Sequence, residues 1–158
     1  MKSILFSGVH GVGKGFFLDK VSKDIEEYNV YSASALIEKY QPSTDAGYKK
    51  VSNVKSNQEV LAKAIKEAKQ KDEKNFILDG HLCIFDSEGN VVRIPENFFR
   101  KTQIEGIVLL QDRPDVIYDR INARDANEID VGAIKQMQNE EQEYAKELKQ
   151  KYQIPFIV

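Results

Sequence analysis

The segment "SGVHGVGKGFF" near the N-terminus constrains the fold more than any other part of the sequence. Gly8, Gly13 and Lys14 have the spacing G-x-x-x-x-G-K, and Gly11 adds a further glycine inside the loop. The apolar run Ile4–Phe6 precedes the loop, and a helical apolar pattern follows it. Glycines allow successive backbone N–H groups to turn toward an anion, while a helix N-terminus and a lysine ammonium add positive potential. We therefore predict a strand, a phosphate-binding loop and a helix in this order.

Five short apolar runs divide the chain, and helical patterns lie between them. The two strongest runs, "GIVLLQ" and "NFILDG", are continuous, which is typical of strands buried on both faces of a parallel sheet. Strands that alternate with helices are joined by crossover connections. We predict a single α/β domain over residues 1–158, a three-layer sandwich in which helices cover both faces of a five-stranded parallel sheet. The strands are expected at Ile4–Phe6, Val30–Ser32, Phe76–Leu78, Ile107–Leu110 and Ile154–Val158.

The second half of the chain contains an insertion and a long charged helix. Glu88, Gly89 and Asn90 lie between two extended-looking runs, which predicts a small β-hairpin insertion near residues 83–94. Further along, apolar residues recur at helical spacing in a highly charged segment. They are Ile134, Met137, Tyr144, Leu148 and Tyr152.

Composition limits the compartment and the kinds of partner. The chain has 158 residues with a net charge of -2, which gives no general attraction to nucleic acid or to an anionic membrane. Its single cysteine, Cys83, cannot form an intramolecular disulfide, and the N-terminal apolar run is too short for a signal peptide or a membrane span. We expect a cytoplasmic protein without a membrane partner and without a nucleic-acid partner. The sequence does not indicate an oligomeric state.

The run "NFILDGH" places an acidic residue at the end of a predicted buried strand. The carboxyl ends of parallel strands open onto the ligand crevice of an α/β fold. Asp79 there is a candidate for holding a magnesium-bound water or orienting an acceptor, and the alternative is a strand-ending residue that caps a turn with Gly80. His81 follows, either near the acceptor or engaged in a structural hydrogen bond.

The segment "RPDVIYDRINARD" predicts a helix that carries two arginines on one face. Arg120 and Arg124 are four residues apart, and Pro114 is well placed in the first turn. Phosphoryl transfer requires cations around the moving group, and the planar guanidinium suits phosphate oxygens. The alternative is ordinary solvated charge on a surface helix.

These motifs, taken in order, resemble those of the P-loop nucleoside monophosphate kinases. The loop "GVHGVGKG" is similar to the G-x-P-G-x-G-K-G-T loop of adenylate kinases, in which Gly15 matches the glycine after the lysine and Phe16 replaces the threonine. The D-x-H of Asp79 and His81 resembles the archaeal-type adenylate kinases most closely, and D-R-I-x-x-R resembles the entry to the kinase lid.

The resemblance implies a P-loop fold that binds ATP, with Mg²⁺ held mainly by phosphate oxygens and water and with Asp79 contacting it through water. It further implies an acceptor arm near residues 33–58, a short lid near 124–131, and catalytic roles for Lys14, Asp79, Arg120 and Arg124, with Arg120 contacting the nucleotide and Arg124 the transition-state charge. The nucleotide is expected to contact Gly8, Val9, His10, Gly11, Val12, Gly13, Lys14, Gly15 and Phe16.

The acceptor site is the least determined part of the sequence. Candidate acceptor ligands are His81, Ser34 and, if the hairpin folds over the site, Arg93. His10 either touches a phosphate or points to solvent. The function expected is transfer of the γ-phosphate of ATP to a nucleoside monophosphate or a similar small acceptor. The alternatives are an ATPase switch that acts on a macromolecular partner and a polynucleotide kinase.

Overall fold

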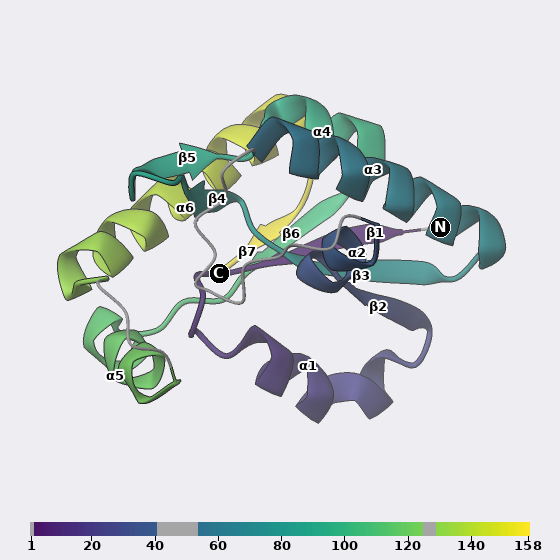
Figure 1. Cartoon of the computed structure of the whole chain (residues 1–158). Coiled ribbons are helices and arrows are strands. Elements are labelled where there is room, and N and C mark those ends of the chain that lie inside the picture. Colours follow the sequence, from purple (N-terminus) through teal and green to yellow (C-terminus); the bar gives the residue numbers. More distant parts are fainter. Residues whose placement is uncertain (1, 41–53, 125–128) are drawn as a thin grey trace.

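A parallel sheet forms the centre of the computed structural model, which describes residues 2–40, 54–124 and 129–158 (Figure 1). Within these residues the sheet has five strands in the order β2-β3-β1-β6-β7. The strands are β1 (Ser3–Ser7), β2 (Tyr28–Ser32), β3 (Asn75–Gly80), β6 (Gly106–Leu109) and β7 (Phe156–Ile157). The helices are α1 (Lys14–Val21), the 3-10 helix η1 (Ser22–Ile25), α2 (Ala33–Tyr40), α3 (Val54–Lys71), α4 (Glu96–Thr102), α5 (Pro114–Arg124) and α6 (Val131–Tyr152).

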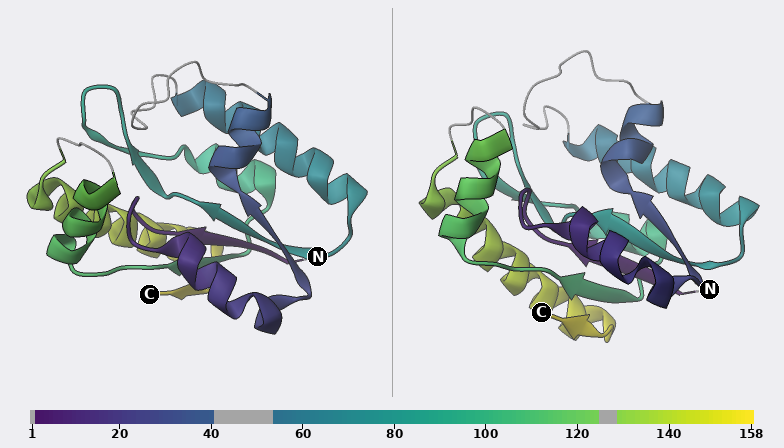
Figure 2. Two further views of the ribbon diagram at one scale, coloured as in Figure 1. Left: turned by 60° about the horizontal axis from the view of Figure 1, so that its bottom comes forward. Right: turned by 90° about the horizontal axis from the view of Figure 1, so that it is seen from below.

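The predicted three-layer sandwich is confirmed. Helix α1 lies on one face of the sheet, whereas α3, α4 and α6 lie over the other (Figures 1 and 2). Phe6 and Ile77 of the strands pack with Leu18 of α1, while Leu5 and Leu78 join the larger core on the opposite face. Strands buried on both faces explain the continuous apolar runs in the sequence.

The register of the strands brings two of their ends together. Phe6 of β1 is opposite Asp79 of β3, and Ser7 is opposite Gly80. The loop that leaves β1 therefore starts beside the segment that leaves β3. Ligands bind at this carboxyl edge in parallel α/β sheets.

The hairpin insertion is also confirmed, and a short helix follows it that the sequence did not predict. Strands β4 (Cys83–Phe85) and β5 (Val91–Arg93) pair antiparallel, and α4 begins directly after Pro95. Phe98 and Phe99 of α4 are buried. Helix α4 has only seven residues, and its two phenylalanines are adjacent in sequence, so the sequence shows no helical periodicity there. The burial of both rings in the core is what favours the helix.

Helices α5 and α6 begin at residues that suit helix N-termini. Pro114 is the first residue of α5, as predicted. Asp130 caps α6, where its Oδ1 accepts a hydrogen bond of 2.7 Å from the N–H of Ala133. Pro114 and Asp130 therefore set where α5 and α6 begin.

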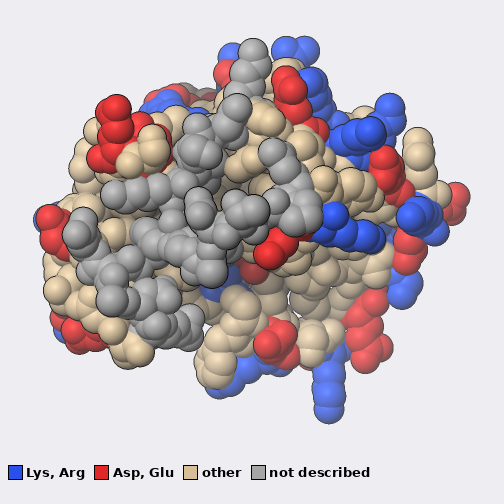
Figure 3. Space-filling model, viewed as in Figure 1, with Lys and Arg blue, Asp and Glu red and all other residues tan. Residues whose placement is uncertain are grey.

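Acidic and basic side chains are interspersed on the face that Figure 3 shows. Such mixing gives no single-sign field on this face. In the described part of the chain, none of the helices combines the length and the hydropathy needed to cross a bilayer.

Candidate active site

The phosphate loop runs from the end of β1 to the start of α1 and presents the N-terminus of that helix. Gly11 and Gly13 have φ angles of 85° and 100°, in the left-handed region that favours glycine. The first intrahelical bond runs from the N–H of Phe17 to the carbonyl of Gly13. The N–H groups of Lys14, Gly15 and Phe16 come before that bond, so the helix itself supplies no acceptor for them. This arrangement is suited to an anion.

Two buried valines of the phosphate loop pack into the core and hold the loop in place. Val9 and Val12 are buried, and the N–H of Val12 donates to the carbonyl of Val9. A Cβ on Gly11 would lie 2.7 Å from Cγ1 of Ile121, and one on Gly8 would lie 2.8 Å from the carbonyl oxygen of Leu110. Close approach by α5 and by Leu110, the residue after β6, therefore excludes side chains at both glycines.

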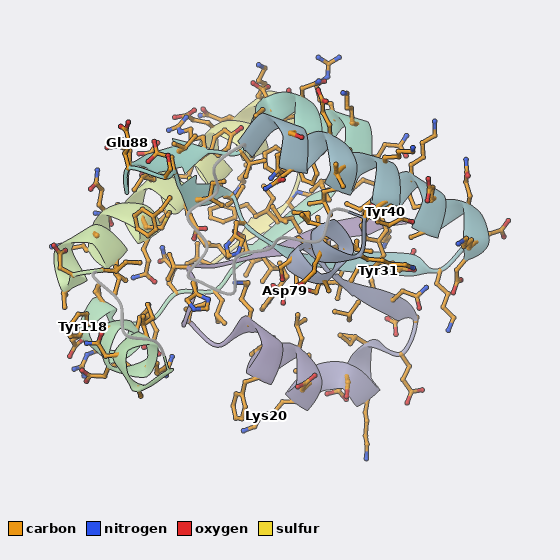
Figure 4. The ribbon with its side chains drawn as sticks, in the orientation of Figure 1. Lys20, Tyr31, Tyr40, Asp79, Glu88 and Tyr118 are labelled. Carbon is orange, nitrogen blue, oxygen red and sulfur yellow. The ribbon has the colours of Figure 1, made fainter. Side chains whose placement is uncertain are left out.

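Three polar side chains meet around the first carbonyl of the loop. Nζ of Lys14 donates to the carbonyl oxygen of Gly8 at 2.9 Å and lies 3.8 Å from Oδ1 of Asp79. Nδ1 of His81 lies 3.0 Å from the same carbonyl oxygen. Because a carbonyl only accepts, Nδ1 carries the proton, and in the neutral ring Nε2 is the nitrogen that can accept one. Asp79 belongs to β3, and Figure 4 shows it on the side of the sheet that faces α1.

A buried carboxyl beneath the loop was missed by the sequence reasoning. Glu141 of α6 is fully buried, and its Oε1 accepts a hydrogen bond of 3.3 Å from Oγ of Ser7. The same hydroxyl oxygen accepts a bond of 2.9 Å from the N–H of Leu82. No described residue bonds to Oε2 of Glu141. Burial raises the pKa of Glu141 to about 7, against the opposing effects of the Lys14 charge and the Ser7 hydrogen bond.

The pattern of α6 contained an indication of this residue. Glu141 falls on the apolar stripe, four residues after Met137 and three before Tyr144. A charged residue on a buried stripe is a candidate for a special role.

Arg120 reaches from α5 to the outer side of the phosphate loop. Its NH1 donates to the carbonyl oxygen of Val12 at 3.1 Å, and its NH2 lies 3.0 Å from Oδ2 of Asp112. Arg120 thereby links the phosphate loop to Asp112, the residue two positions before α5. Arg124 is the last residue of α5, and its side chain lies outside the described part of the chain. The predicted lid near 124–131 and the predicted arm near 33–58 also include residues outside it, at 125–128 and 41–53.

A cavity of about 360 Å³ adjoins the phosphate loop. Val9 and His10 of the loop and Gly80 and His81 after β3 contribute to its wall. Ser34, a predicted acceptor ligand, lines it from α2, and its hydroxyl lies 3.1 Å from that of Ser32. The structure therefore brings His10, Ser34 and His81 to one cavity.

Arg93 lies elsewhere, which argues against its predicted contact with the acceptor. Its guanidinium binds Glu140 and Glu147 of α6, at 2.5 Å and 2.6 Å, and stacks on the ring of Tyr144. Arg93 does not contribute to the cavity lining. The two glutamates hold it because the hairpin packs along α6.

Phe16 does not take the place of the kinase threonine inside the loop. Its side chain is 69% exposed, and the ammonium of Lys20 lies over its ring at 4.7 Å. Only its backbone N–H belongs to the loop's donors. Phe17 stacks on Phe6 of β1 at 5.4 Å.

The donor set suits magnesium bound to phosphates. Among the residues described, no group of three or more His, Cys, Asp or Glu side chains is arranged to hold a metal ion. Mg²⁺ with phosphate and water ligands needs only one or two protein carboxylates. Asp79, beside Lys14, meets that requirement.

A parallel sheet whose first strand ends in a G-x-x-x-x-G-K loop, with an acidic residue at the end of the adjacent strand, defines the P-loop nucleotide-binding fold. A family model described as an AAA domain matches residues 7–138, and the chain belongs to that family.

Two solved structures share this fold. The structure of deoxyadenosine kinase from M. mycoides with bound dATP is 18% identical, with a TM-score of 0.56, and the match covers 100% of this chain and 90% of that one. A gluconokinase from Sinorhizobium meliloti is 14% identical, with a TM-score of 0.50, over 87% of this chain and 73% of that one. No curated protein matches the sequence. The particular likeness to adenylate kinases stays a prediction.

Proposed function

We propose that the protein is an ATP-dependent phosphotransferase that moves the γ-phosphate of ATP to a hydroxyl group of a small acceptor. One observation carries the proposal: the phosphate loop is itself part of the wall of a cavity of about 360 Å³. Cavities of this size bind small molecules. A donor on the loop and an acceptor in the cavity would meet at His10 and His81.

The loop and its cations would hold the donor. Lys14 would exchange the carbonyl of Gly8 for a phosphate oxygen, and the N–H groups at the start of α1 would bind the neighbouring oxygens. Arg120 binds a carbonyl on the outer side of the loop and is proposed, from the resemblance, to contact the nucleotide. Arg124 is proposed, from the resemblance, to contact the transferred group. Magnesium, when bound, neutralises phosphate charge, and Asp79 would hold one of its waters.

Transfer requires one proton to leave the acceptor. The acceptor oxygen forms a bond to the γ-phosphorus while the bond from that phosphorus to the β–γ bridging oxygen breaks, which yields ADP. We assign the acceptor's proton to Nε2 of His81, since Nδ1 donates to Gly8 and orients the ring toward the cavity.

The structural neighbours support transfer to a small molecule, because both are named as kinases of small hydroxyl-bearing compounds. The resemblance to nucleoside monophosphate kinases suggests a nucleotide acceptor. An ATPase switch would need no small-molecule cavity beside its phosphate loop, so the cavity favours the kinase.

The test is ADP release from ATP and Mg²⁺ by the purified protein, alone and with nucleosides, their monophosphates and other small alcohols. We expect one acceptor to raise the rate by orders of magnitude and to appear as its phosphate ester. Lys14→Ala should abolish turnover, whereas Lys23→Ala, on the exposed 3-10 helix, should not. A slow rate that no acceptor changes would favour the ATPase switch instead.

A further inference from the structure

The lining of the cavity is mainly apolar, unlike the phosphate loop beside it. Most of its lining residues are apolar and come from every element that surrounds it. They include Leu61 of α3, Leu78 of β3, Ile94 and Phe98 beside the hairpin, and Met137 of α6. Leu61, Leu78, Ile94, Phe98 and Met137 are each at least 96% buried, so the walls are parts of the main core.

The polar side chains of the lining lie on two walls and include no carboxylate, ammonium or guanidinium group among the described residues. His10 and His81 belong to the wall formed by the loop and the end of β3, and Ser34, Asn57 and Gln58 belong to the wall formed by α2 and α3. Two adjacent primary amides offer donors and acceptors together, which suits a ring edge that also carries both. Among the described lining residues none is Lys, Arg, Asp or Glu.

The described cations near the cavity are held by other partners. In the proposed complex Lys14 binds the phosphates of the donor, and Arg120 binds the loop carbonyl of Val12 and the carboxylate of Asp112. Arg93 is bound by two glutamates on α6. A phosphate group placed among the apolar walls would lose its hydration without a charged partner from these residues, which is strongly unfavourable.

We infer that the acceptor is an uncharged, ring-bearing alcohol of about nucleoside size and carries no phosphate of its own. The inference rests on the proposed function and departs from the nucleoside monophosphate that the resemblance suggests. The apolar walls would pack on the ring, the amides of Asn57 and Gln58 would bind its edge, and the hydroxyl would face His81.

The experiment compares each acceptor with its own phosphate ester. Nucleosides, other uncharged aromatic alcohols and the matching monophosphates are incubated with the protein, Mg²⁺ and γ-labelled ATP, and labelled products are separated and counted. Melting of the protein with ADP and each compound measures binding independently of turnover.

We expect kcat/KM for at least one uncharged compound to exceed that for its phosphate ester by about tenfold or more. Faster transfer to the ester overturns the inference and leaves the proposed function intact. The inference is also overturned if no uncharged compound is phosphorylated and none raises the melting temperature of the protein. If the protein shows no Lys14-dependent ATP turnover with any compound, the proposed function fails as well.

A variant tests the wall that the inference assigns to recognition. Gln58→Glu keeps the shape of the side chain but replaces an amide donor by a charge, and it should raise the KM for the uncharged acceptor about tenfold with little change in the KM for ATP. Gln70→Glu, an exposed position on the same helix, is the matched control and should change neither. An unchanged acceptor KM in Gln58→Glu would contradict the assigned wall.

Discussion

Replacing Glu141 by Gln is expected to remove a pH dependence from the stability of the fold. Burial raises the pKa of this carboxyl from 4.5 to about 7. The stability associated with the protonated form is therefore fully present below about pH 4.5 and is lost as pH rises through about 7. A pKa difference of this size between the folded and unfolded states corresponds to a contribution of about 3 kcal/mol to the free energy of unfolding.

Urea unfolding at a series of pH values measures this effect. Between about pH 5 and about pH 8, the wild type should lose about 2 to 3 kcal/mol more stability than Glu141→Gln. Carboxyls whose pKa is lowered, such as those of Asp72 and Glu96, change stability in the opposite direction but do so in both proteins, so they cancel in the difference.

A control on the same helix separates burial from charge alone. Glu143 is exposed and pairs with Lys146, so Glu143→Gln should follow the wild-type profile. Parallel profiles for the wild type and Glu141→Gln would refute the reasoning, because they would mean that the buried carboxyl titrates as it does in the unfolded chain.

Three further predictions concern the loop, the helix beside it and the thiol. Gly11→Ala should destabilise the fold by about 2 kcal/mol or more in urea unfolding, since a left-handed residue is strained and its Cβ would meet Ile121. Gly89→Ala, with a similar φ of 84° but an open site, should show the conformational cost alone, and equal losses would exclude the clash. Arg120→Ala should weaken ATP binding in calorimetry while changing stability by less than about 1 kcal/mol, and unchanged affinity would exclude a role in donor binding. The Cys83 thiol, buried at the cavity wall and with its pKa raised by burial, should react with a thiol reagent far more slowly in the native protein than after urea unfolds it, and equal rates would contradict its placement.

The parts of the fold that the sequence predicted well depend on local chemistry. The phosphate loop was recognisable because glycines at fixed spacing have few other uses before a helix. The central strands were recognisable because burial on both faces leaves continuous apolar runs, as in Phe76–Leu78. The start of α5 followed from Pro114.

The parts that it missed depend on contacts between distant segments. Glu141 becomes significant only when α6 lies beneath Ser7, which is 134 residues away. The sequence made Arg93 a candidate acceptor ligand, but the hairpin packs on α6, where two glutamates bind the guanidinium. Helix α4 has no periodic pattern and forms because the rings of Phe98 and Phe99 reach the core. Tertiary packing, which a single sequence does not display, decides all three.

The buried contact between Ser7, Glu141 and Leu82 joins the two halves of the proposed site. Ser7 directly precedes the phosphate loop, and Leu82 directly follows the histidine that lines the cavity, so one hydroxyl connects both segments. We expect a displacement of the loop by ATP to shift the cavity wall, which makes the two ligands thermodynamically linked. Such linkage is reciprocal: whatever factor ATP contributes to the affinity for the acceptor, the acceptor must contribute to the affinity for ATP. The strength of the coupling between the two substrates would then depend on a single buried serine.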